Sequence, residues 1–355
     1  MPKLPFPSQR PVLGPRLRRW LLPWLLAVAA LANLAYPMYV HFDFSHSPDT
    51  RSYLRMAAGQ FDSARVTHRY RVLVPAAAAA VASPIAQIYG RVWPQRPAGW
   101  WPLRFAFYVV NCLVLAAAAA CWFNAACAAG ATAPAAALAM VAVLSSRWAE
   151  YAAGLPLTDS LYLLVFGLGY YAVRRGAGGG WALAGALLLG PLAKESFVFL
   201  LPWLLWFGRP ALAWPRQLLA LAGGLAALLL VHYGVDSQLG APASQSISNA
   251  LAHFENLAYS LRRAASLKGF GELLSIFGFF SLLIPAAVWW ENRGNYKNST
   301  PFYASLGWSE IGLVAVVVLH MLLSGDLGRM GYLASPVFCT ALALIFTHYR
   351  RLLRS

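Results

Sequence analysis

Residues 20–40 read WLLPWLLAVAALANLAYPMYV, and residues 41–59 continue directly with HFDFSHSPDTRSYLRMAAG. The first stretch is apolar and, at about 20 residues, long enough to cross a bilayer as a helix. The second is dense in charged and polar groups, which are costly beside a bilayer and therefore usually have a task. Together they predict a membrane span that opens into a functional loop at the water-facing mouth of a membrane domain.

The composition extends this prediction to the whole chain. Of its 355 residues, 59% are hydrophobic and only 11% are charged, and apolar runs recur along the sequence. These values are typical of a polytopic helical membrane protein. No polar segment is long enough for a separate soluble domain. We therefore expect residues 1–355 to form a single transmembrane domain, an all-α bundle of about 10–11 membrane helices with interfacial helices in the first outer loop.

The net charge of +16 is explained by membrane topology. Basic clusters lie between or beyond the apolar runs and contain few acids, as cytoplasmic anchors do. They predict an inner-membrane protein with both termini in the cytoplasm and with residues 41–103 outside, and they give no reason to expect a nucleic-acid partner. The clusters comprise Lys3, Arg10, Arg16, Arg18, Arg19, Arg174, Arg175, Arg209, Arg216, Arg293, Lys297, Arg350, Arg351 and Arg354.

The same alternation of charge assigns the other segments. Residues 72–90 are apolar enough to cross, but a crossing there would place the basic C-terminal tail outside. We therefore expect a helix embedded in the outer face. Further spans are expected at about 104–129, 134–146, 160–173, 217–233, 273–290, 307–323 and 331–348, with an outer loop at 234–272.

Residues 181–207 form one apolar run that is interrupted by Pro191 and by Lys194-Glu195. Basic residues flank the run on both sides, so we expect it to turn back as a broken membrane hairpin. Each arm has about 13 residues, or roughly 20 Å, which is shorter than a ~30 Å hydrocarbon core. The charged tip is therefore expected below the outer surface, at the floor of a cavity.

Ser47-Pro48-Asp49 has the pattern of a helix start, with serine as N-cap, proline at the first position and an acid in the first turn. The helix dipole favours an ionised acid there, and at helical spacing Asp49 shares a face with Tyr53. An ionised carboxylate at the mouth of a cavity is suited to take a proton from an acceptor hydroxyl. The alternative is that Asp49 only caps a short interfacial helix.

Other charged residues stand next to or inside the apolar runs. Asp159 opens the span at 160–173, where helix capping is the simpler explanation. Lys194 and Glu195 need partners or a polar cavity, and a structural ion pair is the alternative. Asp326 and Arg329 have the i, i+3 spacing of a mutual pair, although an interfacial arginine also suits a phosphate. Further phosphate candidates, for which snorkelling to the interface is the alternative, are Arg69, Arg71 and Arg104.

Neither a metal site nor a cofactor is predicted, although a divalent cation stays possible. The four cysteines, in or at the ends of apolar helices, lack zinc-like spacing. His46 and His68 have no second ligand at metal spacing and are expected at solvated loop positions. Nothing in the sequence resembles a glycine-rich nucleotide-phosphate loop followed by a lysine.

In their order, these motifs resemble the GT-C class of membrane glycosyltransferases, the group that contains protein O-mannosyltransferases and lipid A aminoarabinose transferases. The resemblance covers roughly residues 20–210. The chain differs from better-known members in lacking an adjacent Asp-Glu pair in the first loop and a C-terminal soluble domain. The matching blocks are SPDTRSYL at 47–54, WPLRF at 101–105, LTDSLY at 157–162 and GPLAKE at 190–195.

The resemblance implies an inverting transfer of a sugar from a polyprenyl-phosphate-linked donor to a lipid or glycan acceptor at the outer membrane boundary. Asp49 would be the general base, and Asp159 would orient the acceptor or a cation. Cationic side chains would neutralise the leaving lipid phosphate. The expected substrate- and phosphate-binding residues are Tyr53, Arg69, Arg71, Arg104, Lys194, Glu195, Asp326 and Arg329.

Other classes of protein compete with this interpretation. A lipid-carrier or solute transporter would explain charges within the membrane equally well, although transporters usually show an internal repeat or paired broken helices. A polysaccharide polymerase or ligase would also use arginine-rich outer loops. A non-enzymatic scaffold would leave Lys194-Glu195 unexplained.

Overall fold

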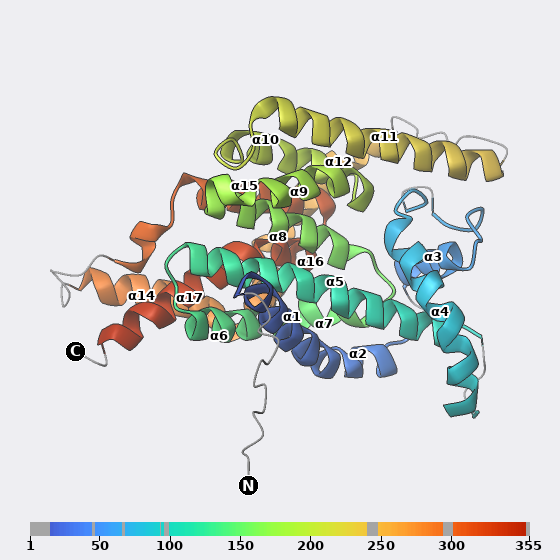
Figure 1. Ribbon diagram of the computed structural model, residues 1–355, viewed down its shortest axis with the longest axis horizontal. Helices are drawn as coiled ribbons and strands as arrows, with labels where there is room; N and C mark the ends of the chain where they lie inside the picture. Colours follow the sequence, from blue (N-terminus) through green and yellow to red (C-terminus); the bar gives the residue numbers. More distant parts are fainter. Residues whose placement is uncertain are drawn as a thin grey trace, which may run out of the picture.

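The computed structural model describes residues 15–44, 47–65, 68–92, 94–95, 99–239, 248–293 and 301–352 (Figure 1). All regular elements within these ranges are helices, so the predicted all-α class is confirmed. His46 and the outermost basic residues of the two ends, Lys3, Arg10 and Arg354, lie outside the described ranges.

Within the described ranges, seven helical segments are long and apolar enough to cross a membrane, and three shorter apolar helices accompany them. These helices identify a membrane protein. The long segments are α1 (Pro15–Leu34) with α2 (Tyr36–His41), α4 (Leu73–Val92), α5 (Trp101–Ala128), α8 (Asp159–Arg175) with α9 (Gly180–Ala193), α11 (Trp214–Leu239), α13 (Leu267–Phe277) with α14 (Leu283–Asn292), and α16 (Leu327–Gly331) with α17 (Ser335–Leu352). The shorter helices are α6 (Ala133–Leu144), α10 (Phe197–Phe207) and α15 (Trp308–Ser324).

Helix α5 forms the centre of the bundle and packs against α1, α4, α8 and α17 (Figure 1). Gly167 of α8 lies at its contact with α5, and small residues let membrane helices approach closely. A Cβ atom at Gly167 of α8 would lie 3.1 Å from the Trp122 Nε1 and 3.2 Å from the Ala118 carbonyl oxygen. The α5–α8 contact is therefore tight, and α8 is held as a rigid element whose first residue is Asp159.

The chain folds back twice after α8. Gly176, at φ +62°, ends α8 and starts the 3₁₀ turn η2 (Gly176–Gly179), after which α9 packs along α8. Helix α9 ends at Ala193, and α10 begins at Phe197. A Cβ atom at Gly190 would overlap the ring of Phe197, so the two arms approach closely because this position has no side chain. Lys194 and Glu195 therefore lie in the turn between two short helices.

The segment predicted as an outer loop at 234–272 is helical over most of its described length. Helix α11 continues to Leu239, α12 covers Ser248–Ala264, and α13 begins at Leu267. Tertiary contact decides this outcome, since α12 packs against α15 and α13 packs against α16. The span expected at 273–290 is also interrupted, because Gly278, at φ +55°, begins the 3₁₀ turn η3 (Gly278–Leu282) between α13 and α14.

Three short helices, α3, α7 and α16, lie between the longer helices of the bundle. Helix α3 (Pro48–Ala57) lies at the right-hand side of Figure 1 and packs against α4 and α5. Helix α7 (Arg147–Gly154) precedes α8, and α16 packs against α13 and α15. Two 3₁₀ turns, η4 (Phe302–Ser305) and η5 (Tyr332–Ala334), complete the fold. Helix α4 is long and apolar enough to cross a membrane. That it lies embedded in the outer face instead of crossing stays a prediction.

Candidate functional site

Asp49 stands in the first turn of α3 without serving as its cap. Ser47 is the N-cap, because its hydroxyl accepts a hydrogen bond from the Thr50 backbone N–H at 3.4 Å. Pro48 takes the first helical position, where its missing N–H costs nothing. The Asp49 side chain is 27% exposed and is directed toward cations of other segments. The simple capping interpretation of Asp49 therefore does not account for its position.

Arg329 of α16 joins Asp49 to Asp159. Its Nη2 and Nε donate to Oδ2 of Asp159 at 2.6 and 2.9 Å, and its Nη1 donates to Oδ2 of Asp49 at 3.1 Å. A planar guanidinium with several fixed donors can hold two carboxylates in this way, whereas an ammonium group is a single point charge. One side chain thus contacts two acids that lie 280 and 170 positions before it in the chain.

Two further cations complete this group of charges. Nζ of Lys194 lies 3.8 Å from Oδ1 of Asp159, and it also lies 5.6 Å from the ring centre of Tyr162. Arg65, whose side chain is 57% exposed, lies 3.6 Å from Oδ1 of Asp49. We call Asp49, Asp159, Lys194, Arg329 and Arg65 the charge cluster. It holds three cations and two carboxylates, so its balance favours binding of an anion.

A second network fixes the first loop to the hairpin turn. Arg71 donates to Oε2 of Glu195 from Nη2 at 2.6 Å and from Nε at 3.1 Å. Its Nη1 also donates to the Tyr53 hydroxyl at 2.9 Å. Burial raises the pKa of Tyr53, so its hydroxyl stays protonated at neutral pH. Lys194 and Glu195 do not pair with each other, because each has a partner on another segment.

His68 is buried, although the sequence suggested a solvated loop position. Its ring stacks on the ring of Tyr53 with 5.0 Å between the centres. Burial and, second, the charge of Arg71 lower its pKa to about 4. The imidazole is therefore neutral at pH 7, and the 3.8 Å from its Nε2 to Oδ1 of Asp49 is a polar contact rather than an ion pair. The arginines around it in the sequence, Arg65, Arg69 and Arg71, were the available signal.

The structure does not bring every predicted residue to the charge cluster. Arg104 lies on the rings of Phe44 and Trp101 and donates to the Tyr39 carbonyl oxygen at 3.2 Å. Arg69 donates from Nη2 to the carbonyl oxygen of Ala64, in its own loop, at 3.5 Å.

Asp326 does not form the ion pair that its spacing allowed. Its carboxylate accepts from the Arg329 backbone N–H at 3.0 Å and caps α16. Burial raises the pKa of this carboxyl group. Asp326 thus supports the helix that presents Arg329, while the Arg329 side chain points to other acids.

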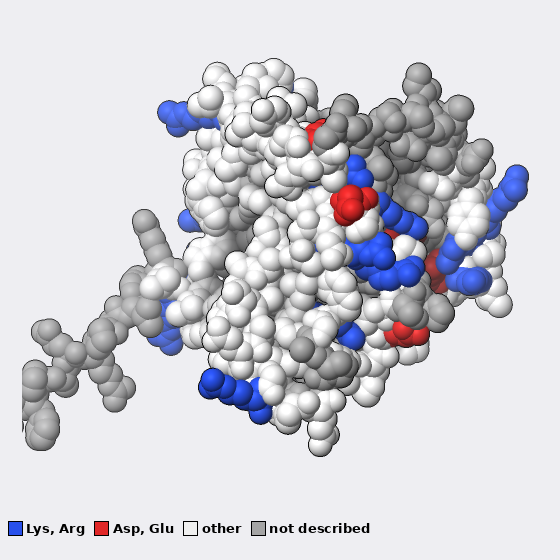
Figure 2. Space-filling model, turned by 90° about the vertical axis from the view of Figure 1, so that its right-hand side faces the viewer, with Lys and Arg blue, Asp and Glu red and all other residues white. Residues whose placement is uncertain are grey.

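Acidic and basic side chains lie together at the end of the molecule that carries α3 (Figure 2). Figure 2 looks at the end that carries α3 and shows acidic and basic side chains near the middle of a surface that is otherwise mostly uncharged. Across the described ranges, no three His, Cys, Asp or Glu residues come together in a way that would hold a metal ion. In the charge cluster the Arg329 guanidinium lies between the two carboxylates and contacts both.

The arrangement offers a partly exposed carboxylate, a buried one and an excess of positive charge, all at the end of an apolar bundle. Such a site suits a substrate with an anionic group and a hydroxyl to be activated. Comparison of the chain with protein-family models, with curated proteins and with solved structures finds no match.

Proposed function

We propose that the protein is a membrane glycosyltransferase of the GT-C type. It moves a sugar from a polyprenyl-phosphate-linked donor to a lipid or glycan acceptor on the extracytoplasmic side. The observation that supports this proposal is the convergence of Asp49, Asp159, Lys194 and Arg329 from four separate segments. Charged groups beside membrane helices are expensive, and their assembly into one unbalanced cluster indicates a function.

The two carboxylates have different surroundings and therefore different roles. The Asp159 side chain is 11% exposed and is held by Arg329 and Lys194. Asp49 is more exposed, so it is the acid that an acceptor hydroxyl reaches. In the proposed step the acceptor oxygen attacks the anomeric carbon while the bond from that carbon to the phosphate oxygen breaks. The proton goes to Asp49, the electron pair leaves with the lipid phosphate, and the anomeric configuration inverts.

The cations have the task of stabilising the leaving phosphate. Negative charge grows on that group as the glycosidic bond breaks, and prearranged cations in a partly dry site stabilise it strongly. Arg329 and Arg65 both lie within ion-pair distance of Asp49, so the phosphate and the base share one location. A lipid-phosphate donor also needs no nucleotide-binding loop, and the sequence contains no such motif.

A transporter of lipid-linked substrates is the second candidate, and the break at Gly278 favours it. Together with the turn at Lys194 it makes two interrupted apolar segments, which transporters often pair around a substrate site. The two candidates differ in their products, because a transporter leaves the bond between sugar and phosphate intact.

The decisive experiment uses the purified chain in proteoliposomes with undecaprenyl-phosphate-linked glucose, mannose, galactose and aminoarabinose, each radiolabelled in the sugar. A lipid and glycan extract supplies the acceptors. We expect release of undecaprenyl phosphate from at least one donor with transfer of label to an acceptor. Asp49→Asn should lower this turnover by about 10²–10⁴-fold.

The matched control is Asp62→Asn, which changes another acid of the same loop. Asp62 accepts from the neighbouring Ser63 backbone N–H at 2.8 Å and takes no part in the charge cluster. Its turnover should equal that of the wild type. Movement of intact donor across the membrane without cleavage would identify the transporter instead. Unchanged turnover in a folded Asp49→Asn variant would refute the base assignment.

A further inference from the structure

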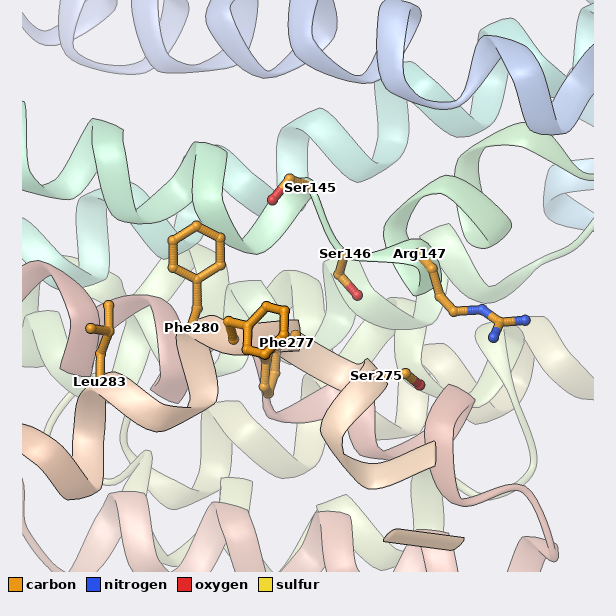
Figure 3. A pocket seen from close by; sticks show the side chains of 9 residues that line it. Ser145, Ser146, Arg147, Ser275, Phe277, Phe280 and Leu283 are labelled. Carbon is orange, nitrogen blue, oxygen red and sulfur yellow. The ribbon is translucent and has the colours of Figure 1, made fainter. Parts of the chain in front are cut away.

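Two kinds of polar contact hold the bundle together away from the charged residues. Figure 3 shows Ser146 and Ser275 beside an apolar groove, and each hydroxyl donates to a backbone carbonyl oxygen, that of Ser146 to Ile276 and that of Ser275 to Glu272. These bonds fix backbone segments. His320 is different, because its hydrogen bonds continue through a second side chain toward the charge cluster.

His320 is a polar residue in an apolar part of the bundle. It lies in the last turns of α15 and is only 2% exposed. Three aromatic rings lie around its imidazole, with 5.8 Å to the ring centre of Tyr162, 5.9 Å to that of Phe166 and 5.4 Å to that of Phe199. An ionisable side chain among membrane helices is costly, and such a residue is therefore expected to have a function.

The hydrogen bonds of His320 have a defined direction. Its Nδ1 lies 2.9 Å from the Val316 carbonyl oxygen, which can only accept, so Nδ1 carries the hydrogen of the neutral ring. The lone pair on Nε2 then accepts from the Tyr162 hydroxyl at 2.7 Å. The Tyr162 oxygen in turn accepts from the Ser196 hydroxyl at 3.4 Å. This chain of hydrogen bonds joins the α9–α10 turn, α8 and α15.

The bond between Tyr162 and His320 requires the neutral ring. A protonated ring would donate from Nε2, and the Ser196 carbonyl oxygen lies 3.1 Å from that atom. The Tyr162 hydroxyl would then lose its acceptor. Because burying a charge among aromatic rings is costly, the neutral ring is favoured, and Tyr162 keeps its bond.

Tyr162 connects these hydrogen bonds to the charge cluster. The Lys194 ammonium group lies over its ring, 5.6 Å from the ring centre, and also lies 3.8 Å from Oδ1 of Asp159. At this distance a cation is attracted to the face of a tyrosine ring. Tyr162 and Asp159 are three residues apart on α8, so the ring and the carboxylate lie on the same side of the helix. The ring holds the ammonium group in one place only when its own orientation is fixed, and the bond to His320 fixes it.

We propose that His320 is a positioning residue for Lys194: it fixes the Tyr162 ring, and the ring holds the ammonium group beside Asp159. The effect on turnover rests on the proposed function, whereas the place of Lys194 is measurable without any substrate. Helix α15 thus supports the site, although none of its residues belongs to the charge cluster.

The first test measures the reactivity of Lys194 toward acetic anhydride by mass spectrometry, with the full-length protein in detergent and the exposed Lys268 as internal reference. The Lys194 side chain is 14% exposed. His320→Leu and Tyr162→Phe should each raise the ratio of Lys194 to Lys268 labelling severalfold, because the ammonium group loses its fixed place. Tyr162→Phe keeps the ring and tests the hydroxyl alone. The double variant should equal the single variants, since both changes remove the same hydrogen bond.

His320→Gln is the rescue variant. Its side-chain oxygen reaches the position of Nε2 and can accept from the Tyr162 hydroxyl, so it should restore most of the protection of Lys194. His320→Asn is shorter and should behave like His320→Leu. A role in packing alone predicts the opposite order, because leucine fills the apolar surroundings better than glutamine does.

The second test is the transfer assay described above. His320→Leu and Tyr162→Phe should lower kcat by about 10–100-fold, because a charged group of the site is misplaced. The KM for the donor should change little, since Arg329 and Arg65 keep their places.

Tyr108→Phe is the matched control, because the hydroxyl of this buried tyrosine donates to the Ala32 carbonyl oxygen where α5 meets α1. It should change neither labelling nor turnover. Wild-type labelling of Lys194 in both His320→Leu and Tyr162→Phe, or failure of His320→Gln to restore protection, would overturn the proposal. Such labelling together with sugar transfer would keep the transferase. Altered labelling without transfer from any donor would reject the transferase and keep the positioning role.

Discussion

The two ends of α8 carry buried charges that are organised in opposite ways. At its last turn, Arg174 donates to Oε1 of Glu310 at 3.1 Å and to the Ser305 carbonyl oxygen at 2.9 Å. Glu310 is only 4% exposed, and its other oxygen accepts from the Gly307 backbone N–H at 2.8 Å. This is one cation with one acid, and both have further hydrogen bonds. Such a pair is complete and holds helices together.

At the first turn of α8 the charges are unequal. Asp159 shares Arg329 with Asp49 and has Lys194 as a second cation, and Arg65 extends the cluster into solvent. Positive charge therefore exceeds negative charge where the site is partly open. The comparison teaches that a buried ion pair by itself does not indicate function, whereas an unbalanced and accessible cluster does.

The largest effect is expected at the balanced end. Glu310→Gln leaves the Arg174 guanidinium buried without its acid, which should lower the free energy of unfolding by about 3–5 kcal/mol. Thermal unfolding of the purified protein in detergent measures the loss. Turnover per folded molecule should not change, because Glu310 lies at the other end of α8 from the charge cluster. A large fall in that turnover would remove the distinction between the two ends.

Arg329→Lys should affect catalysis instead. A lysine keeps the charge but cannot hold two carboxylates in one plane, so turnover should fall by about 10²–10³-fold. Arg174→Lys makes the same chemical change at the opposite end of α8 and serves as the control, with turnover close to that of the wild type. Similar turnover in the two variants would show that the Arg329 bridge has no catalytic role.

The pH dependence of stability tests the surroundings of the charge cluster. The folded pKa of His68, about 4, lies below the value of about 6.5 for an unfolded chain. Only the unfolded state binds a proton between these values, so stability is complete above pH 6.5 and falls as the pH approaches 4, by up to about 3 kcal/mol. His68→Phe keeps the stacking on Tyr53 and should flatten this decline. Unfolding midpoints from pH 7 to 4 compare the two proteins, and parallel curves would contradict the assignment.

The smallest effect concerns the cap of α16. Asp326→Ala removes an acceptor for the Arg329 backbone N–H and should cost about 1 kcal/mol, whereas Asp326→Asn should cost only a few tenths. Thermal unfolding of the two variants measures the difference, and Asp326→Ala should unfold at a lower temperature than Asp326→Asn. Equal losses in both variants would mean that the charge of Asp326, rather than its capping geometry, stabilises the protein.

The sequence was sufficient to predict the class of fold and to select the candidate site residues. Apolar runs of membrane length depend on composition alone, and they predicted an all-helical membrane protein. Asp49, Asp159, Lys194 and Arg329 were selected because each carries charge beside an apolar run. Their partners were not predictable, since partners 170 or 280 positions apart are brought together by tertiary packing.

Local patterns were misleading where tertiary contacts decide the outcome. The spacing of Asp326 and Arg329 suggested an ion pair, but the nearby acids of other segments compete for the same guanidinium. The adjacent Lys194 and Glu195 separate for the same reason. His68 is buried because the ring of Tyr53 lies beside it, and the helices within 234–272 pack against α15 and α16. None of these contacts leaves a periodic signal in the sequence.

The order of the charged residues along the chain has a consequence for biosynthesis. Asp49, Asp159 and Lys194 are all made before Arg329, which follows Gly328 in the first turn of α16. Before Arg329 is made, Lys194 is the cation within ion-pair distance of Asp159, and no guanidinium of α16 links Asp159 to Asp49. Arrival of α16 and α17 supplies the guanidinium that joins both acids. The link between the two acids therefore forms only after α16 has been made, and a ribosome-bound chain that ends before α16 lacks it.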